Sequence, residues 1–376
     1  MSNLYCAAPW RGLHINPNGD VKTCCAGDPN MLGNLNDKHI EEILHGPVMQ
    51  EIRQTIRQGR LHPTYCYNCI RAERYGRSER DWHNNISPNF DCQLASDTDH
   101  VPVLIDVRWN TTCNLSCNYC GDKCSSKWAA LKNIPVKSGA RPYYEQICDY
   151  LEQHKDNIKE VALVGGEPLL LPENERLLDV IPDNCTVILI TNMSVDLDTN
   201  KIFKKLALRT KVGWSMSFDN IGSQFEYVRY GGNWELLEKN ILQIKSLFAQ
   251  GQWGGVQAVY SIYNATRLNE FISWVKGMGI NIQWQGLYQP ECLDPLKHNQ
   301  QVRDLALLEI KKVLGRTDLT SSERGFFQQA EINCQLPLEK MLTNEFQNHI
   351  NEIETKYHPD QAGQFIKLWP EFNNLL

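Results

Sequence analysis

Six apolar runs of strand length, separated by amphipathic segments, constrain the fold of this 376-residue chain more than any other feature. The runs are VLIDVRW (103–109), EVALVG (160–165), TVILIT (186–191), VGWSMS (212–217), VQAVYSI (256–262) and NIQWQG (281–286). Sequences with helical periodicity lie between them, such as NWELLEKNILQIKSLFAQ and TRLNEFISWVKGMG. This alternation predicts a parallel sheet with right-handed crossovers. Six strands fit a doubly wound sheet or an incomplete parallel barrel, and both place functional residues at the carboxyl ends of the strands.

The chain divides into three regions by pattern. Residues 1–95 are irregular and rich in cysteine, with a hairpin signal in LHINPNGDVKTC and one helix signal in HIEEILHGPVMQEIRQTIRQ, interrupted at Gly46-Pro47. The polar segment SPNFDCQLASDTDHVP is typical of a linker. We therefore expect a small amino-terminal module at 1–95, an α/β core at 101–290 and a helical carboxyl-terminal extension at 291–376.

Composition narrows the class of protein. Hydrophobic residues make up 42% and charged residues 22% of the chain, as in an ordinary globular protein. Neither an export signal nor an apolar run long enough for a membrane is visible, so we expect a cytoplasmic protein. In that reducing compartment, fourteen cysteines favour metal binding or chemistry over disulfides. The net charge of −6 argues against broad nucleic-acid binding.

Although the chain as a whole is acidic, residues 53–80 contain seven arginines and only two glutamates. The arginines are Arg53, Arg57, Arg60, Arg71, Arg74, Arg77 and Arg80, and the glutamates are Glu73 and Glu79. A solvated surface that pairs with acids elsewhere is the favoured interpretation. A patch for an anionic substrate or an acidic peptide is the alternative.

The segment TTCNLSCNYCGDKC (111–124) follows the first predicted strand and carries a C-x3-C-x2-C triplet, Cys113, Cys117 and Cys120. A structural zinc site uses four ligands, often from paired C-x2-C knuckles. Three thiolates suit an iron–sulfur cluster that leaves one iron without a protein ligand. Cys124 is a competing fourth ligand at this point.

The segment CNLSCNYC resembles the cluster motif of radical S-adenosylmethionine (SAM) enzymes, in which three cysteines hold a 4Fe–4S cluster and SAM binds the fourth iron. The second predicted strand ends in GGEP (165–168), similar to the family motif that binds the SAM amino group. Glycines allow a close backbone approach, and a carboxylate pairs with a cation. The resemblance implies an incomplete (βα)6 barrel and makes Cys124 a second-sphere or structural thiol. The implied SAM-binding residues are Tyr119, Gly165, Gly166, Glu167, Asn192, Ser217, Asp219 and Arg229. For Tyr119, a place near the adenine competes with simple loop packing.

Four of the upstream cysteines, Cys6, Cys24, Cys66 and Cys69, could hold zinc or an iron–sulfur cluster. Cys25 competes with Cys24, because neighbouring residues on a strand point to opposite faces. The pattern C-x12-G-x4-C followed by C-x2-C resembles the auxiliary-cluster module of radical SAM enzymes, the SPASM module in its shorter "twitch" form. That resemblance selects Cys24 and implies one auxiliary 4Fe–4S cluster. The module usually follows the barrel, whereas here it precedes it.

The resemblance implies that a reduced cluster cleaves SAM to a 5′-deoxyadenosyl radical, which abstracts a hydrogen atom from a peptide or a small metabolite. The auxiliary cluster suits a net oxidation or a cross-link, with flavodoxin or ferredoxin as the kind of electron donor expected. An epimerase with Cys292 as hydrogen donor is one alternative, although a spare buried cysteine is favoured there. A non-catalytic metal-binding scaffold is another, and a nucleic-acid-modifying enzyme fits the acidic charge least. The roles of Cys25 and Cys92 stay open.

Overall fold

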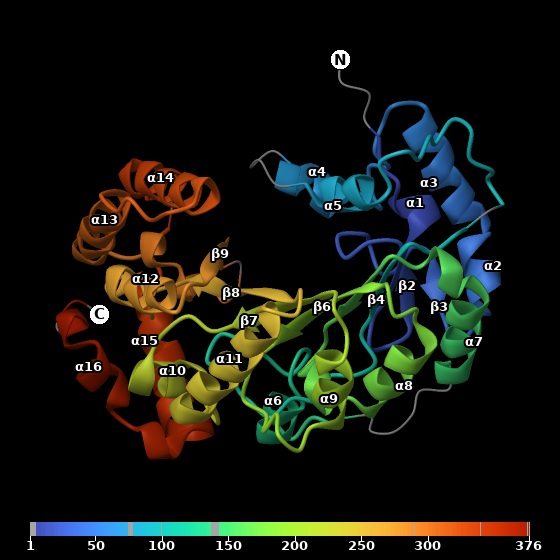
Figure 1. Cartoon of the computed structure of the whole chain (residues 1–376). Helices are drawn as coiled ribbons and strands as arrows, with labels where there is room; N and C mark the ends of the chain where they lie inside the picture. Colours follow the sequence, from blue (N-terminus) through green and yellow to red (C-terminus); the bar gives the residue numbers. More distant parts are fainter. Residues whose placement is uncertain are drawn as a thin grey trace.

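One nine-stranded sheet runs through the molecule (Figure 1), in a computed structural model that describes residues 5–73, 78–98, 100–136, 143–287, 289–338, 340–373 and 375. Its strand order is β3-β2-β1-β4-β5-β6-β7-β8-β9. The strands are β1 (Gly12–Ile15), β2 (Asp20–Lys22), β3 (Gly33–Asn34), β4 (Leu104–Val107), β5 (Glu160–Leu163), β6 (Thr186–Thr191), β7 (Val212–Ser217), β8 (Trp253–Tyr260) and β9 (Asn281–Gly286).

The six predicted core strands are confirmed as β4 to β9, each parallel to its neighbour. The first two are shorter than predicted, since β4 ends at Val107 and β5 at Leu163, and the residues that follow turn into loops. The parallel strands form an open, incomplete barrel rather than a closed one, as predicted. Along β6 the side chains alternate between half-buried and buried, because only one face of the sheet meets the main hydrophobic core.

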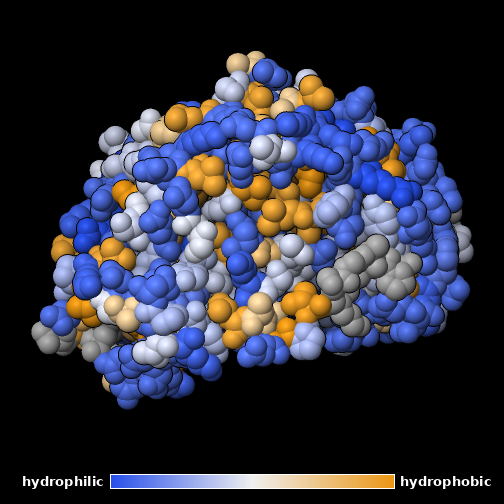
Figure 2. Space-filling view, turned by 90° about the horizontal axis from the view of Figure 1, so that it is seen from below, coloured by the Kyte–Doolittle hydropathy of each residue, from blue (hydrophilic) through white to orange (hydrophobic). Residues whose placement is uncertain are grey.

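Helices between the strands cover that face, on the lower side of the sheet in Figure 1. The longer ones are α7 (Tyr144–His154), α8 (Pro172–Val180), α9 (Lys201–Ala207), α11 (Trp234–Phe248) and α12 (Leu268–Gly277), with α6 (Ser126–Leu131) and α10 (Gly222–Val228) in the loops after β4 and β7. Seen from below, hydrophobic residues gather near the middle of the surface and hydrophilic ones surround them (Figure 2). Among the described residues, Leu208 after α9 is the most exposed large apolar side chain, at 88%.

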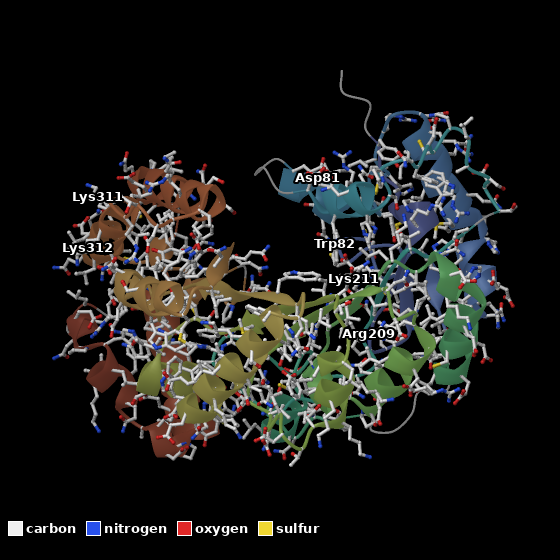
Figure 3. The ribbon with its side chains drawn as sticks, in the orientation of Figure 1. Asp81, Trp82, Arg209, Lys211, Lys311 and Lys312 are labelled. Atoms are coloured by element: carbon white, nitrogen blue, oxygen red, sulfur yellow. The ribbon has the colours of Figure 1, made fainter. Side chains whose placement is uncertain are left out.

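The amino-terminal module continues the same sheet. The predicted hairpin is confirmed as β1 and β2, and β1 also pairs in parallel with β4. The predicted helix is confirmed as α2 (Ile40–Leu44) and α3 (Pro47–Arg57), broken at Gly46. The module's other helices are α1 (Ala8–Arg11), α4 (Tyr67–Glu73) and α5 (Glu79–Ile86). Figure 3 shows Trp82 pointing from α5 toward the sheet, and its indole N–H donates to Oε1 of Glu160 at 2.7 Å. The module is therefore anchored to the core by both backbone pairing and side-chain contact.

The prediction that the arginines of residues 53–80 form a solvated surface is wrong for Arg53. Its side chain is fully buried, donates from Nε and Nη2 to the carbonyl oxygen of Pro9 at 3.1 and 2.9 Å, and also bonds the carbonyl of Asp97. Its guanidinium lies 5.7 Å from the ring centroid of Trp10. The predicted pairing with acids does occur for Arg57 with Asp97 (2.6 Å) and Arg80 with Glu73 (2.5 Å). Arg74, Arg77 and the side chains of Arg71 and Glu79 lie outside the described residues. These contacts hold the module and the linker together rather than forming an anion patch.

The carboxyl-terminal region is helical, as predicted. It comprises α13 (Gln300–Leu314), α14 (Ser321–Gln335), α15 (Thr343–Glu352) and α16 (Gln364–Leu368), with a π-helical turn at Ile353–Tyr357 and short 3-10 turns around them. Glu323 of α14 accepts hydrogen bonds from Lys276 of α12 and from the backbone N–H of Ile282 in β9. In the described part of the chain, no helix has the length and apolar character needed to cross a membrane.

Replacing Arg53 with methionine is expected to lower the free energy of unfolding by about 2–4 kcal/mol, because the carbonyl of buried Pro9 would lose the guanidinium that donates to it twice. Urea unfolding of the anaerobic protein measures the change. Arg60→Met is the matched control, since Arg60 is exposed and, among the described residues, its side chain bonds only Gln58. It is expected to change stability by less than about 0.5 kcal/mol. Equal midpoints for the two variants would show that Arg53 has no structural role.

Candidate active site

The cysteine loop after β4 is fixed against the end of β5 by backbone contact. The backbone N–H of Glu167 donates to the carbonyl oxygen of Thr112 at 2.8 Å. A Cβ atom at Gly166 would lie 2.1 Å from that same oxygen. Gly165 has φ = 139°, a conformation that favours glycine. The space beside Gly166 on its Cβ side is thus filled by the cysteine loop, and the role of both glycines in SAM binding stays a prediction.

The structure gathers the three predicted cluster thiols at this loop. The backbone N–H of Leu115 and the side-chain amide of Asn192 donate to Sγ of Cys113 at 3.5 and 3.7 Å. Burial raises the pKa of Cys117 to about 12; nearby Arg229 acts in the opposite direction, and the Cys113 thiol adds to the rise. A hydrogen bond between Cys120 and the exposed Cys124 raises the pKa of the Cys120 thiol, and burial adds to that rise. The same hydrogen bond lowers the pKa of Cys124, and burial acts in the opposite direction.

This donor set fits an iron–sulfur cluster. Soft thiolates that accept N–H hydrogen bonds, without a histidine among them, are what such clusters use. Within the described ranges, no three His, Cys, Asp or Glu residues are arranged to hold a single metal ion. A 4Fe–4S cluster holds its thiolates farther apart than one ion does, so loosely spaced thiols are compatible with it.

Glu167 lies fully buried beside the cysteine loop. Its Oε1 accepts hydrogen bonds from the Thr191 hydroxyl at 2.8 Å and the Leu169 backbone at 3.1 Å, and its Oε2 accepts from the Asn192 backbone at 2.7 Å. Burial raises its pKa to about 7, and the three hydrogen bonds act in the opposite direction. Glu167 and Asn192 of the predicted SAM-binding set are therefore brought together with Cys113.

Asp219, after β7, connects two more predicted residues. Its Oδ2 accepts from the hydroxyl of Tyr119 at 2.6 Å and from Nε and Nη2 of Arg229 at 3.2 and 3.0 Å. The Arg229 guanidinium lies 5.4 Å from the Tyr119 ring centroid. Oδ1 of Asp219 accepts from the Val259 backbone at 2.6 Å. This network ties the residue before Cys120 to the ends of β7 and β8, which supports the loop-packing interpretation of Tyr119. Ser217 is half-buried in register with Gln257, outside this network.

The four predicted auxiliary cysteines also meet. Burial raises the pKa of Cys6 well above its usual value, and the thiols of Cys24, Cys66 and Cys69 raise it further. Four thiols in mutual electrostatic reach, with no histidine among them, fit a second cluster. Cys24 belongs to this group, whereas Cys25 is in electrostatic contact with Lys22 and Arg108 instead. The four auxiliary cysteines come before β1 or after β2, and both of these positions lie near the amino end of β4. The triplet of Cys113, Cys117 and Cys120 lies at the other end, after the last residue of β4.

The sequence reasoning missed a polar row on the face of the sheet opposite the main core. His14 is in register with Lys22 on one side and with Asp106 on the other. Nδ1 of His14 lies 2.9 Å from Oδ2 of Asp106, which also accepts from Nη2 of Arg108 at 3.0 Å. Alternating charges within the otherwise apolar run VLIDVRW were the signal that could have revealed it.

The second missed feature is a brace from the carboxyl-terminal helices to the cysteine loop. Nε2 of His358 lies 3.1 Å from the Ser116 hydroxyl, and the His358 ring stacks on Tyr230 with centroids 3.7 Å apart. Nε2 of His349, on α15, donates to the carbonyl of Asn118 at 2.9 Å. Both contacts fall between the predicted ligands, so residues far along the chain position the loop.

Two further cysteines, Cys92 and Cys292, lie away from both groups of thiols. Cys292 is buried in a second hydrophobic cluster with Leu293 and Tyr263, and its carbonyl accepts from His298 at 2.8 Å. Cys92 is buried in the linker, where its carbonyl accepts from Arg57 at 2.8 Å. Both positions agree with packing thiols.

Gly166→Ala is expected to displace the cysteine loop, because the new methyl would overlap the Thr112 carbonyl. Iron analysis after anaerobic reconstitution should then show about half the iron of the wild type, with the auxiliary site still filled. Gly121→Ala is the matched control in the same loop, since a Cβ there meets no atom within 4 Å. Equal iron in both variants would contradict this role of Gly166.

His358→Phe keeps an aromatic ring against Tyr230 and removes the Ser116 hydrogen bond. We expect a loss of about 1–2 kcal/mol of unfolding free energy near neutral pH. Burial lowers the pKa of His358 from 6.5 to about 4, partly offset by Asp360. As the pH falls, His358 is protonated in the unfolded chain at a higher pH than in the folded protein. The stabilisation by neutral His358 is therefore present above pH 6.5 and is lost as the pH falls toward 4. Urea midpoints of wild type and variant should converge over that range, and a constant difference would contradict it.

Comparisons with known proteins agree with this site. Residues 6–70 match the SPASM family, described as an iron–sulfur cluster-binding domain. A 129-residue stretch, 34% of the chain, is 30% identical to 7-carboxy-7-deazaguanine synthase of Clostridium acetobutylicum and spans about half (52%) of that curated relative.

Solved structures with partial likeness include Streptococcus suis SuiB bound to S-adenosylmethionine (16% identical, TM-score 0.41, covering 58% of this chain and 48% of SuiB). Another is native anSMEcpe with bound AdoMet (18% identical, TM-score 0.39, covering 54% and 57%). The match of residues 6–70 agrees with the predicted auxiliary iron–sulfur cluster. Both sequence matches agree with the resemblance to radical SAM enzymes, and residues 6–70 match a SPASM-type iron–sulfur cluster-binding domain that lies on the amino-terminal side of the barrel.

Proposed function

We propose that this chain cleaves SAM reductively at a 4Fe–4S cluster held by Cys113, Cys117 and Cys120, and that it uses the resulting radical to oxidise or cross-link a peptide or a small metabolite. The strongest support is that the loop carrying the three thiols is held beside Glu167. The backbone N–H of Glu167 donates to the Thr112 carbonyl of that loop, and the same carbonyl packs against Gly166. When bound, the cluster supplies the electron that splits SAM into methionine and a 5′-deoxyadenosyl radical.

Glu167 is suited to hold the SAM amino group. Its carboxylate is fully buried and held in place by Thr191, Leu169 and Asn192. A bound ammonium beside it would lower its pKa from about 7 and keep it ionised. Arg229 and Asp219 keep the wall beside Cys117 polar but neutral overall, because their charges offset one another at 3.0 Å.

The substrate would lie on the open face of the sheet, between the two groups of thiols. That face carries half-buried side chains such as Ile188, Ile190 and Ser215, in contrast to the face covered by helices. An auxiliary cluster on Cys6, Cys24, Cys66 and Cys69 would accept the electron that a substrate radical gives up in a net oxidation. A flavodoxin or a ferredoxin is the kind of partner that would supply the first electron.

The test is to incubate the anaerobically reconstituted protein with SAM and dithionite and to measure 5′-deoxyadenosine by mass spectrometry. We expect the nucleoside from the wild type and none from Cys117→Ala, which removes a predicted cluster ligand. Cys148→Ala is the matched control, because Cys148 is buried in α7 among core residues, and it should still produce 5′-deoxyadenosine.

Two results would contradict the proposal. One is unchanged product from Cys117→Ala, and the other is bound zinc in place of iron together with no SAM cleavage. Protein that carries about eight irons but cleaves SAM only after a cell extract is added would support it and give an assay for finding the substrate.

A further inference from the structure

Two cations, Lys22 and Arg108, lie on the face of the sheet opposite the main core. The Cα register of β2, β1 and β4 aligns Lys22, His14 and Asp106, so their side chains point to the same face. Arg108 follows Asp106 by two residues and donates to both of its carboxylate oxygens, at 3.2 and 3.0 Å. Lys22 and Arg108 are in electrostatic contact with each other.

Positive charge exceeds negative charge in this row. Asp106 is its only carboxylate, and its oxygens are already used by Arg108 and His14. Lys22 is only 6% exposed, and among the described residues its ammonium bonds only the carbonyl oxygen of Cys25, at 2.7 Å. The Arg108 side chain is 32% exposed, and no described residue accepts a hydrogen bond from its Nη1. Two cations thus share one carboxylate, and Arg108 keeps one N–H group available, so the row can receive a further negative group.

The row also lies between the two predicted clusters. Lys22 ends β2 two residues before the auxiliary cysteine Cys24, and Arg108 follows the last residue of β4 in the segment that leads to Cys113. A group held by both cations would therefore be placed between the SAM-cleaving cluster and the auxiliary cluster, where a substrate must lie to meet both.

We propose that Lys22 and Arg108 form a binding site for an oxyanion of the substrate, a carboxylate or a phosphate, on the open face of the sheet. The inference rests on the proposed function for its location and narrows the substrate to acids or phosphate esters. Asp106 and His14 act as positioning residues, because they hold the Arg108 guanidinium toward the site and leave its Nη1 available.

The experiment uses the reconstituted full-length protein, with acetate and inorganic phosphate as probes in place of the unidentified substrate. Replacing chloride by about 20 mM of either probe at constant ionic strength should raise the wild-type Tm by about 1–3 °C. Lys22→Met and Arg108→Met should lose most of that shift. Lys211→Met is the matched control, because Lys211 precedes β7 away from the row, and it should keep the shift. Lys22→Arg and Arg108→Lys, which keep both charges, should also keep it and would show that lost folding is not the cause.

The outcomes separate the possible anions. An equal shift in all variants, or none in the wild type, would overturn the proposal, since the clusters would then satisfy both cations. Equilibrium dialysis with SAM should give Kd values within about twofold of the wild type; a large loss of SAM binding in Arg108→Met would assign the site to the SAM carboxylate and overturn the substrate assignment. Formation of 5′-deoxyadenosine by the variants tests the proposed function independently, because SAM cleavage without substrate does not need this site.

Discussion

The parallel pairing of β1 with β4 is the contact on which the arrangement of this molecule depends. It is only four residues long, from Gly12 opposite Leu104 to Ile15 opposite Val107. Through it the amino-terminal hairpin becomes part of the barrel sheet, although the order of the domains along the chain is the reverse of the usual one. A module attached through sheet hydrogen bonds cannot shift by one residue without moving every side chain of β1 to the other face. The auxiliary thiols, the polar row and the SAM motifs are thereby held in one rigid frame.

The sequence predicted the elements of the core well, because its signals are local. Each parallel strand is a short apolar run, and each crossover helix has a clear periodicity, so β4 to β9 follow from pattern alone. The choice of Cys24 over Cys25, which the family pattern made, agrees with the electrostatic contact of Cys24 with Cys6. Predicting that Cys6, Cys24, Cys66 and Cys69 meet required a family pattern, because more than forty residues separate the second from the third.

Other features could not be predicted, since they arise from contacts between distant segments. Nothing near residue 53 indicates that its guanidinium caps the carbonyls of Pro9 and Asp97, so a buried residue was counted with the surface. The close contact of Gly166 with the Thr112 carbonyl was not predicted either, because that carbonyl belongs to another loop. The contact of His358 with Ser116 joins residues 242 positions apart, beyond any local signal. In each case tertiary structure supplies the partner, and sequence shows only one half of the pair.

The brace from the carboxyl-terminal helices has a consequence for how the protein is made. The auxiliary cysteines lie between residues 6 and 69, close in sequence to the hairpin of β1 and β2. His349 and His358, which hold the loop of Cys113, Cys117 and Cys120, follow that loop by more than 200 residues. The two predicted metal sites can therefore form at different times. The auxiliary thiols need only the amino-terminal module, whereas the loop after β4 reaches its final geometry only after the carboxyl-terminal helices have been made and have packed against it.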